Sequence, residues 1–255
     1  MELNAIHRHD TILQRGLTTS VHLITAESLV WLKNLANQER PSSILLANSQ
    51  HYYWATAAHV MKNLGGAAEC LRIVPSDASR ISLPFNKQYC VKRDKSDGED
   101  YKDVLMLRLD MNEFDLSGDA PLAAQDLEQG VLPAERLKQG DELWIVGYPA
   151  ERTLVDYDAS AIWSTRSVLR AFYKDASISE HCHSVFVDTS IQLASYDGLS
   201  GSPLFYMKHE QFQGEHVRLP LLVGMLQRGT ASSKIAHFVS SKVLVDIVRV
   251  AESTA

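Results

Sequence analysis

The sequence predicts an all-β protein that ends in a single helix. Short runs of apolar, β-branched and aromatic residues recur along its 255 residues with polar breaks between them, a pattern typical of antiparallel strands. The stretch 116–140 is less regular, contains prolines and glycines, and separates an earlier series of runs from a later one. We therefore expect an N-terminal unit over 1–115, a connection over 116–140 and a C-terminal unit over 141–255. The hydrophobic fraction of 45% is enough to form a substantial core.

The N-terminal unit contains six predicted strands and one helical insert. The strands are expected at 21–24, 44–47, 52–56, 71–74, 89–92 and 104–109. A helix is expected over 26–37, because Leu29, Leu32 and Ala36 recur at helical spacing and Thr25 can cap the first turn. The aromatic run 52–54 is expected in the core.

The C-terminal unit shows the same pattern followed by a helix. Its strands are expected at 143–148, 168–173, 185–189, 203–206, 221–226 and 235–239. The helix is expected over 240–251, with Val243, Ile247 and Val250 on the stripe that packs on the second unit.

Charge and composition exclude several classes of partner. The formal net charge is −6 and the sequence has no Lys/Arg-rich block, so we expect no nucleic acid partner. No run of about 18 apolar residues occurs, so we expect no membrane association. The first residues lack the apolar core of a signal peptide, and the three cysteines are an odd number at irregular spacing. These features favour a location in the reducing cytoplasm. The alternative is an exported protein from which a leader has been removed.

Three short blocks carry the functional signal. They are Ala55-Thr56-Ala57-Ala58-His59, then an aspartate leading an apolar strand at 103–109, then Gly198-Leu199-Ser200-Gly201-Ser202-Pro203. In residue types and order they resemble the signatures of trypsin-like (chymotrypsin-fold) serine proteases, and bacterial trypsin-like peptidases without zymogen activation in particular. The resemblance implies two six-stranded antiparallel Greek-key barrels, with the helical insert and the C-terminal helix added to them. It also implies a serine endopeptidase.

The chemistry of such an enzyme assigns a role to each block. A serine hydroxyl is a weak nucleophile at neutral pH, so it needs a base, and the base needs a third group to fix its tautomer. By resemblance, Ser200 is the nucleophile, His59 the base and Asp103 the orienting carboxylate. The backbone N–H groups of Gly198 and Ser200 correspond to the oxyanion hole.

Two features near Ser200 depart from the digestive enzymes. Leu199 stands where they carry the aspartate that receives a new N-terminus, so the zymogen switch is expected to be absent, and Asp197 is not assumed to replace it. The expected substrate pocket consists of Ala194, Ser195, Gln227 and Gly229, and His237 is a further candidate for its lining. Because Ala194 replaces the aspartate of trypsin, we expect small or medium uncharged P1 residues rather than Lys or Arg.

Other interpretations of the sequence stay open. A protease fold without activity, used as a binding or regulatory module, is the alternative function, favoured by the helical insert and the unusual pocket. The cluster Glu180-His181-Cys182-His183 has no second cluster at a suitable spacing, so we expect a surface loop rather than a metal site, and no metal or cofactor. The expected partners are a protein or peptide substrate and, by analogy with partner-switched relatives, a protein activator.

Overall fold

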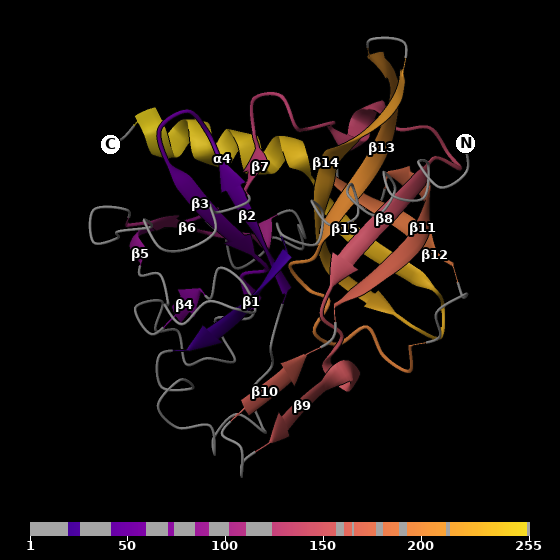
Figure 1. Cartoon of the computed structure of the whole chain (residues 1–255), viewed down its shortest axis with the longest axis horizontal. Coiled ribbons are helices and arrows are strands. Elements are labelled where there is room, and N and C mark those ends of the chain that lie inside the picture. Colours follow the sequence, from indigo (N-terminus) through magenta and orange to yellow (C-terminus); the bar gives the residue numbers. More distant parts are fainter. Residues whose placement is uncertain are drawn as a thin grey trace.

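The protein is built from an N-terminal sheet and a C-terminal barrel that lie side by side, with one helix across their top (Figure 1). The computed structural model describes residues 20–25, 42–59, 71–73, 85–91, 102–110, 124–156, 161–164, 166–176, 181–188, 193–212 and 215–253. The predicted helical insert at 26–37 lies outside these residues. This arrangement of two β units and a terminal helix is the chymotrypsin-like fold that the sequence predicted.

The N-terminal sheet has the strand order β4-β1-β2-β3-β6-β5, and β7 is added to it by parallel pairing with β2. Its strands are β1 Ser20–Thr25, β2 Ser42–Ala47, β3 Tyr52–Thr56, β4 Leu71–Ile73, β5 Phe85–Cys90, β6 Leu105–Leu109 and β7 Gln125–Asp126. The polar turn at 48–51 joins β2 and β3 as expected, and Tyr53 and Trp54 are fully buried. The prediction for β5 began four residues late, because Asn86, Lys87 and Gln88 are polar and exposed, as suits a strand at the sheet edge.

The C-terminal unit is a closed antiparallel barrel of six strands in the order β11-β12-β15-β14-β13-β8. The strands are β8 Glu142–Gly147, β11 Ser167–Ala176, β12 Cys182–Val187, β13 Pro203–Phe212, β14 Glu215–Thr230 and β15 Ile235–Ser240. Two 3-10 turns, Ala134–Arg136 and Ala150–Arg152, and the small hairpin of β9 Thr153–Asp156 and β10 Ala161–Ser164 complete the described chain. The sequence analysis did not anticipate this hairpin, which projects below the barrel in Figure 1.

The interpretation of 180–183 as a surface loop was wrong for two of its residues. Cys182 and His183 begin strand β12 and are almost fully buried. His183 lies within 2.9 Å of the Tyr173 hydroxyl and stacks on Phe238, so an aromatic cluster in the barrel accommodates the polar ring. Burial lowers the pKa of His183, which favours the neutral imidazole inside the barrel.

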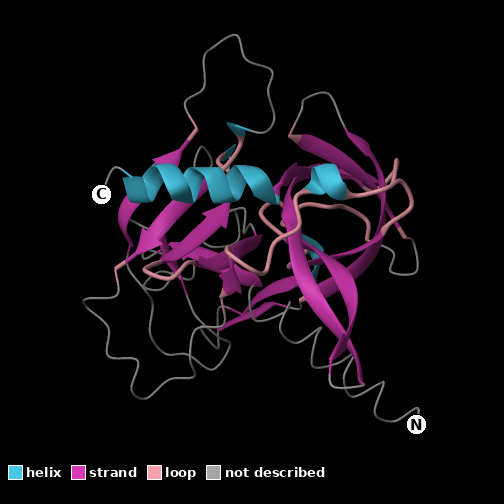
Figure 2. Cartoon of the chain, turned by 90° about the horizontal axis from the view of Figure 1, so that it is seen from above, coloured by secondary structure: helices cyan, strands magenta, loops and turns pink. Residues whose placement is uncertain are grey.

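The C-terminal helix α4, Ser241–Ser253, crosses both β units, as Figure 2 shows from above. Its buried apolar side chains are Val243, Leu244, Val248 and Ala251. The predicted stripe was wrong at Val250, which is 62% exposed. The buried side chains join one core with residues of both units, so the helix packs on more than the second barrel. No helix in the described part of the chain is long and apolar enough to cross a membrane.

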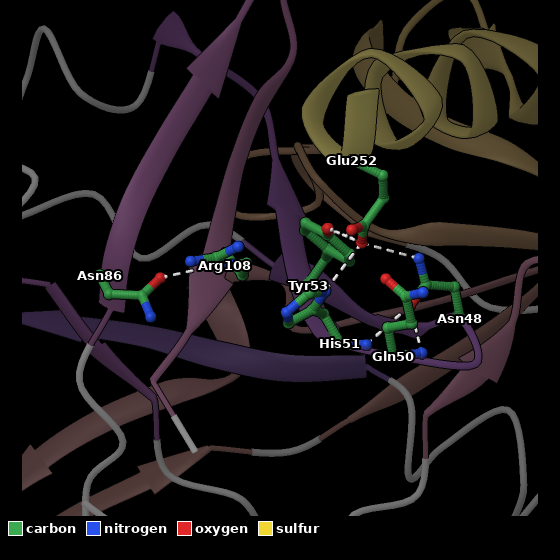
Figure 3. A network of polar contacts seen from close by, with 7 residues as sticks. All are labelled: Asn48, Gln50, His51, Tyr53, Asn86, Arg108 and Glu252. Atoms are coloured by element: carbon green, nitrogen blue, oxygen red, sulfur yellow. Dashed lines mark hydrogen bonds and ion pairs between the residues drawn. The ribbon is translucent and has the colours of Figure 1, made fainter. Parts of the chain in front are cut away.

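The last turn of α4 is fixed to the N-terminal sheet by the carboxylate of Glu252 (Figure 3). Its Oε1 accepts hydrogen bonds from Asn48 Nδ2 and His51 Nδ1, both at 2.9 Å, and from the Tyr53 hydroxyl. Burial of the carboxylate acts to raise its pKa, but these three donors outweigh burial and lower the pKa of Glu252 to about 2. The helix therefore connects the barrel from which it emerges to the β2–β3 hairpin that leads to His59.

Candidate active site

His59 and Asp103 meet at one end of the N-terminal sheet. Strands β3 and β6 are antiparallel, and Thr56 at the end of β3 pairs with Leu105 at the start of β6. The residues just after β3 and just before β6 must therefore lie at the same edge. His59 follows β3 by three residues and Asp103 precedes β6 by two, so the pairing brings the imidazole and the carboxylate together.

Both carboxylate oxygens of Asp103 contact His59, and each has a different partner. Oδ1 accepts the backbone N–H of His59 at 2.8 Å, and Oδ2 lies 2.6 Å from the ring Nδ1. An ionised carboxylate only accepts, so Nδ1 carries the proton and Nε2 of the neutral ring is left as an acceptor. The Asp103 side chain is 15% exposed and that of His59 35%, so the carboxylate is shielded while the ring is accessible to a substrate.

The segment that carries Ser200 lies against the first strands of the N-terminal sheet. A Cβ atom built on Gly201 would be 1.9 Å from Ser42 O and 2.6 Å from Thr56 Oγ1, so no side chain fits there. Gly201 also has a φ of 91°, a conformation that glycine adopts without strain. The glycine after Ser200 is thus required by a close approach of the two units, next to the strand that leads to His59.

The Ser200 hydroxyl donates its hydrogen bond to the carbonyl oxygen of Gln227 at 2.9 Å. A hydroxyl has one proton, so it cannot donate to His59 Nε2 in this rotamer. Proton transfer to His59 therefore requires the hydroxyl to turn away from Gln227 O. The β14 backbone thus fixes the resting position of the hydroxyl.

Two peptide groups, the one that joins Asp197 to Gly198 and the one that joins Leu199 to Ser200, are each oriented by a hydrogen bond to the carbonyl oxygen. Asp197 O accepts the N–H of Ala150 at 2.8 Å, and Leu199 O accepts the N–H of Ser202 at 2.9 Å. In a trans peptide the N–H points opposite to the C=O. The N–H groups of Gly198 and Ser200 are directed away from those donors, and within the described part of the chain neither has an acceptor. Two such donors can stabilise an oxyanion.

Ser42 is a residue at this site that the sequence analysis missed. Gly198 O accepts both the backbone N–H of Ser42, at 3.0 Å, and its hydroxyl, at 2.9 Å. The same hydroxyl oxygen accepts the N–H of Tyr148 at 2.8 Å. Ser42 is fully buried, so these bonds are made without competition from water. One serine at the start of β2 therefore joins the N-terminal sheet to the Gly198 turn, and a lone serine gives no sequence signal for such a role.

The four predicted pocket residues occupy two facing segments. Ala194 is exposed and Ser195 half-buried, and Glu151 Oε2 accepts both of their N–H groups, at 2.8 and 3.3 Å. Gln227 is buried, and its side-chain oxygen accepts a hydrogen bond from Cys182 Sγ at 3.8 Å. The side-chain amide of Gln227 therefore points towards β12. Gly229 lies on β14, opposite Ala236 of β15. His237 is the next residue on β15 and pairs with Arg228.

The described residues contain no group of three or more His, Cys, Asp or Glu side chains that could hold a metal ion. The arrangement around His59 and Ser200 itself offers side-chain and backbone groups. It combines an oriented imidazole, a nearby alcohol-bearing turn and two backbone N–H donors, the components of acyl transfer.

The closed barrel, the N-terminal sheet beside it and the site between them define the trypsin-like fold of the serine proteases. Solved structures of this fold match almost the whole chain. Kallikrein-related peptidase 10 in complex with Zn²⁺ aligns with a TM-score of 0.56 at 15% identity, covering 94% of this chain and 98% of its own. The scabies mite inactivated protease paralogue S-I1 aligns with a TM-score of 0.58 at 15% identity, over 94% and 96%. A Glu endopeptidase aligns with a TM-score of 0.57 at 12% identity, over 93% and 91%.

Comparison at the level of sequence gives no further assignment. No protein-family profile matches the chain, and no curated protein sequence matches it either. The fold is therefore shown by structure, and the activity must be argued from the site.

Proposed function

We propose that this protein is a serine endopeptidase that hydrolyses peptide bonds of a protein or peptide substrate. The observation that carries the proposal is the pair of bonds from His59 to Asp103, which leaves Nε2 of the accessible imidazole as a base. The adjacent Ser200 segment, with its two N–H donors, supports the same assignment.

In the proposed reaction the Ser200 hydroxyl rotates from Gln227 O to His59 and gives its proton to Nε2 while Oγ attacks the scissile carbonyl carbon. The resulting oxyanion is stabilised by the N–H groups of Gly198 and Ser200. His59 then passes the proton to the leaving amine as the C–N bond breaks, and an acyl-enzyme remains on Ser200. Water, deprotonated by His59, hydrolyses the ester and restores the hydroxyl.

A second candidate is a protease fold that binds a partner without catalysis. The hydrogen bond from Ser200 to Gln227 O favours it, because a hydroxyl kept in this rotamer would not be activated. One of the similar structures is named an inactivated protease paralogue, so the fold can exist without activity.

Covalent labelling of the full chain by a fluorophosphonate probe distinguishes the two candidates. The peptidase is expected to be labelled at Ser200 and to cleave a peptide library, with turnover reduced on the order of 10⁶-fold by Ser200→Ala or His59→Ala. Ser202→Ala is the matched control, since it removes a neighbouring hydroxyl and should leave labelling unchanged. A folded wild-type protein with neither labelling nor cleavage would support the binding module instead.

A further inference from the structure

The position of the substrate side chain follows from the bonds around Ser200. The hydroxyl donates to Gln227 O at 2.9 Å, and the N–H of Gly201 donates to Leu226 O at 2.7 Å. The end of β14 therefore runs directly beside the nucleophile. If the substrate carbonyl is held by Gly198 and Ser200, the P1 side chain enters between the segment 194–198 and the residues 227–229.

The ring of Tyr196 already lies in that space. A Cβ atom built on Gly229 would be 2.8 Å from Tyr196 Cδ2, closer than side-chain carbons approach each other, so even a methyl group would collide there. The far side of the space is closed as well, since Ile235 O and the Ala236 methyl group both lie 3.0 Å from the same point. Tyr196 packs against the apolar core of the barrel, and its burial raises the pKa of the phenol. A neutral ring thus covers Gly229.

The backbone that carries Tyr196 is held on both sides. Tyr196 O accepts the N–H of Leu199 at 3.1 Å. On the other side, Glu151 Oε2 accepts the N–H groups of Ala194 and Ser195, and Ser195 Oγ accepts the N–H of Asp197 at 3.0 Å. Because the backbone of Tyr196 is held in place, a large P1 side chain would be accommodated only if the ring gave up its packing against the barrel core, which costs free energy.

We propose that Tyr196 is the specificity-determining residue of this site and restricts cleavage to bonds that follow small residues: Gly, Ala or Ser. This inference rests on the proposed peptidase activity. The P1 space is filled by the enzyme's own aromatic side chain, which lies against Gly229 of β14, so only a side chain of at most two heavy atoms fits beside it.

A panel of fluorogenic peptides that differ only at P1 tests the inference. Wild type is expected to cleave after Gly, Ala or Ser with kcat/KM at least tenfold above Leu, Phe, Lys and Glu. Tyr196→Ala should raise kcat/KM for Leu and Phe at least tenfold, mainly through KM, while changing the value for Ala only a few-fold. Tyr196→Phe keeps the ring and should keep the wild-type preference. Tyr206→Ala is the matched control, because Tyr206 of β13 is also a partly buried ring packed against the barrel core. This variant should keep the wild-type P1 preference.

The outcomes separate this inference from the proposed function. Wild-type protein that is labelled at Ser200 and cleaves after Phe or Lys as readily as after Ala would overturn the role of Tyr196 and leave the peptidase standing. An absence of labelling and cleavage in every variant would overturn both. If Tyr196→Ala does not fold, the wild-type panel and Tyr196→Phe decide the question alone.

Discussion

Replacing Asp103 with asparagine should remove almost all activity, even though the two side chains have the same shape. The backbone N–H of His59 donates to one oxygen of Asp103 and cannot become an acceptor. The single amide oxygen of asparagine must therefore face this N–H, which turns its NH₂ group towards His59 Nδ1. Facing a donor, Nδ1 becomes an acceptor and the proton of the neutral ring moves to Nε2, where it blocks removal of the Ser200 proton.

The expected loss in kcat is about 10⁴-fold, the size known for this substitution in serine-protease triads. It corresponds to about 5.5 kcal/mol of transition-state stabilisation, at 1.36 kcal/mol for each factor of ten. The assay is steady-state hydrolysis of the best peptide found for wild type, combined with ¹⁵N NMR of the histidine ring to identify the tautomer.

Asp197→Asn is the matched control, because it removes an equal charge from an exposed residue beside the Gly198 turn. Its kcat should stay within a few-fold of the wild-type value. If Asp103→Asn retained kcat within tenfold of wild type while Ser200→Ala was inactive, Asp103 would not be needed to fix the tautomer of His59.

Two further predictions concern residues that hold the site together. Ser42→Ala should lower kcat by about tenfold at nearly constant KM, less than the roughly 10²-fold loss of a whole oxyanion donor, because Gly198 O keeps its backbone partner. It should also destabilise the fold by about 1–3 kcal/mol, since the buried N–H of Tyr148 loses its acceptor, and an unchanged urea midpoint would contradict this. Glu252→Gln should lower the free energy of unfolding by about 1–2 kcal/mol at pH 7, after allowance for solvent screening. Because the pKa of Glu252 falls from 4.5 to about 2 on folding, this stabilisation is complete above about pH 4.5 and is lost as the pH falls towards 2. The difference in the free energy of unfolding between wild type and variant should therefore shrink as the pH is lowered. A constant difference from pH 7 to 2.5 would contradict the stabilising role of the Glu252 hydrogen bonds.

Sequence could predict the parts of the molecule in which one block of residues carries its own signal. The strands before His59 and after Asp103 consist mostly of apolar or aromatic residues, so their ends, and the places of His59 and Asp103 beside them, followed from the pattern. The β2–β3 hairpin followed from its polar turn in the same way.

The parts that could not be predicted depend on contacts between distant residues. His183 is polar by type, and only its contacts with Tyr173 and Phe238 explain why it lies in a buried strand. Val250 has helical spacing with Val243, but the direction from which two β units approach the helix decides which face is covered. Ser42 donates a hydrogen bond to Gly198, which is 156 positions away in sequence. The Tyr196 ring can lie against β14 only because Gly229 has no side chain.

The Glu252 contacts connect residues about 200 positions apart in sequence. Translation proceeds from the N-terminus, so the hairpin that carries Asn48, His51 and Tyr53 leaves the ribosome long before its carboxylate partner exists. Contacts of such high sequence separation also form late and slowly in folding. A nascent chain would therefore join the helix to the hairpin that leads to His59 only after every described strand has been synthesised, so this connection between the two β units is completed at the end of translation of this region.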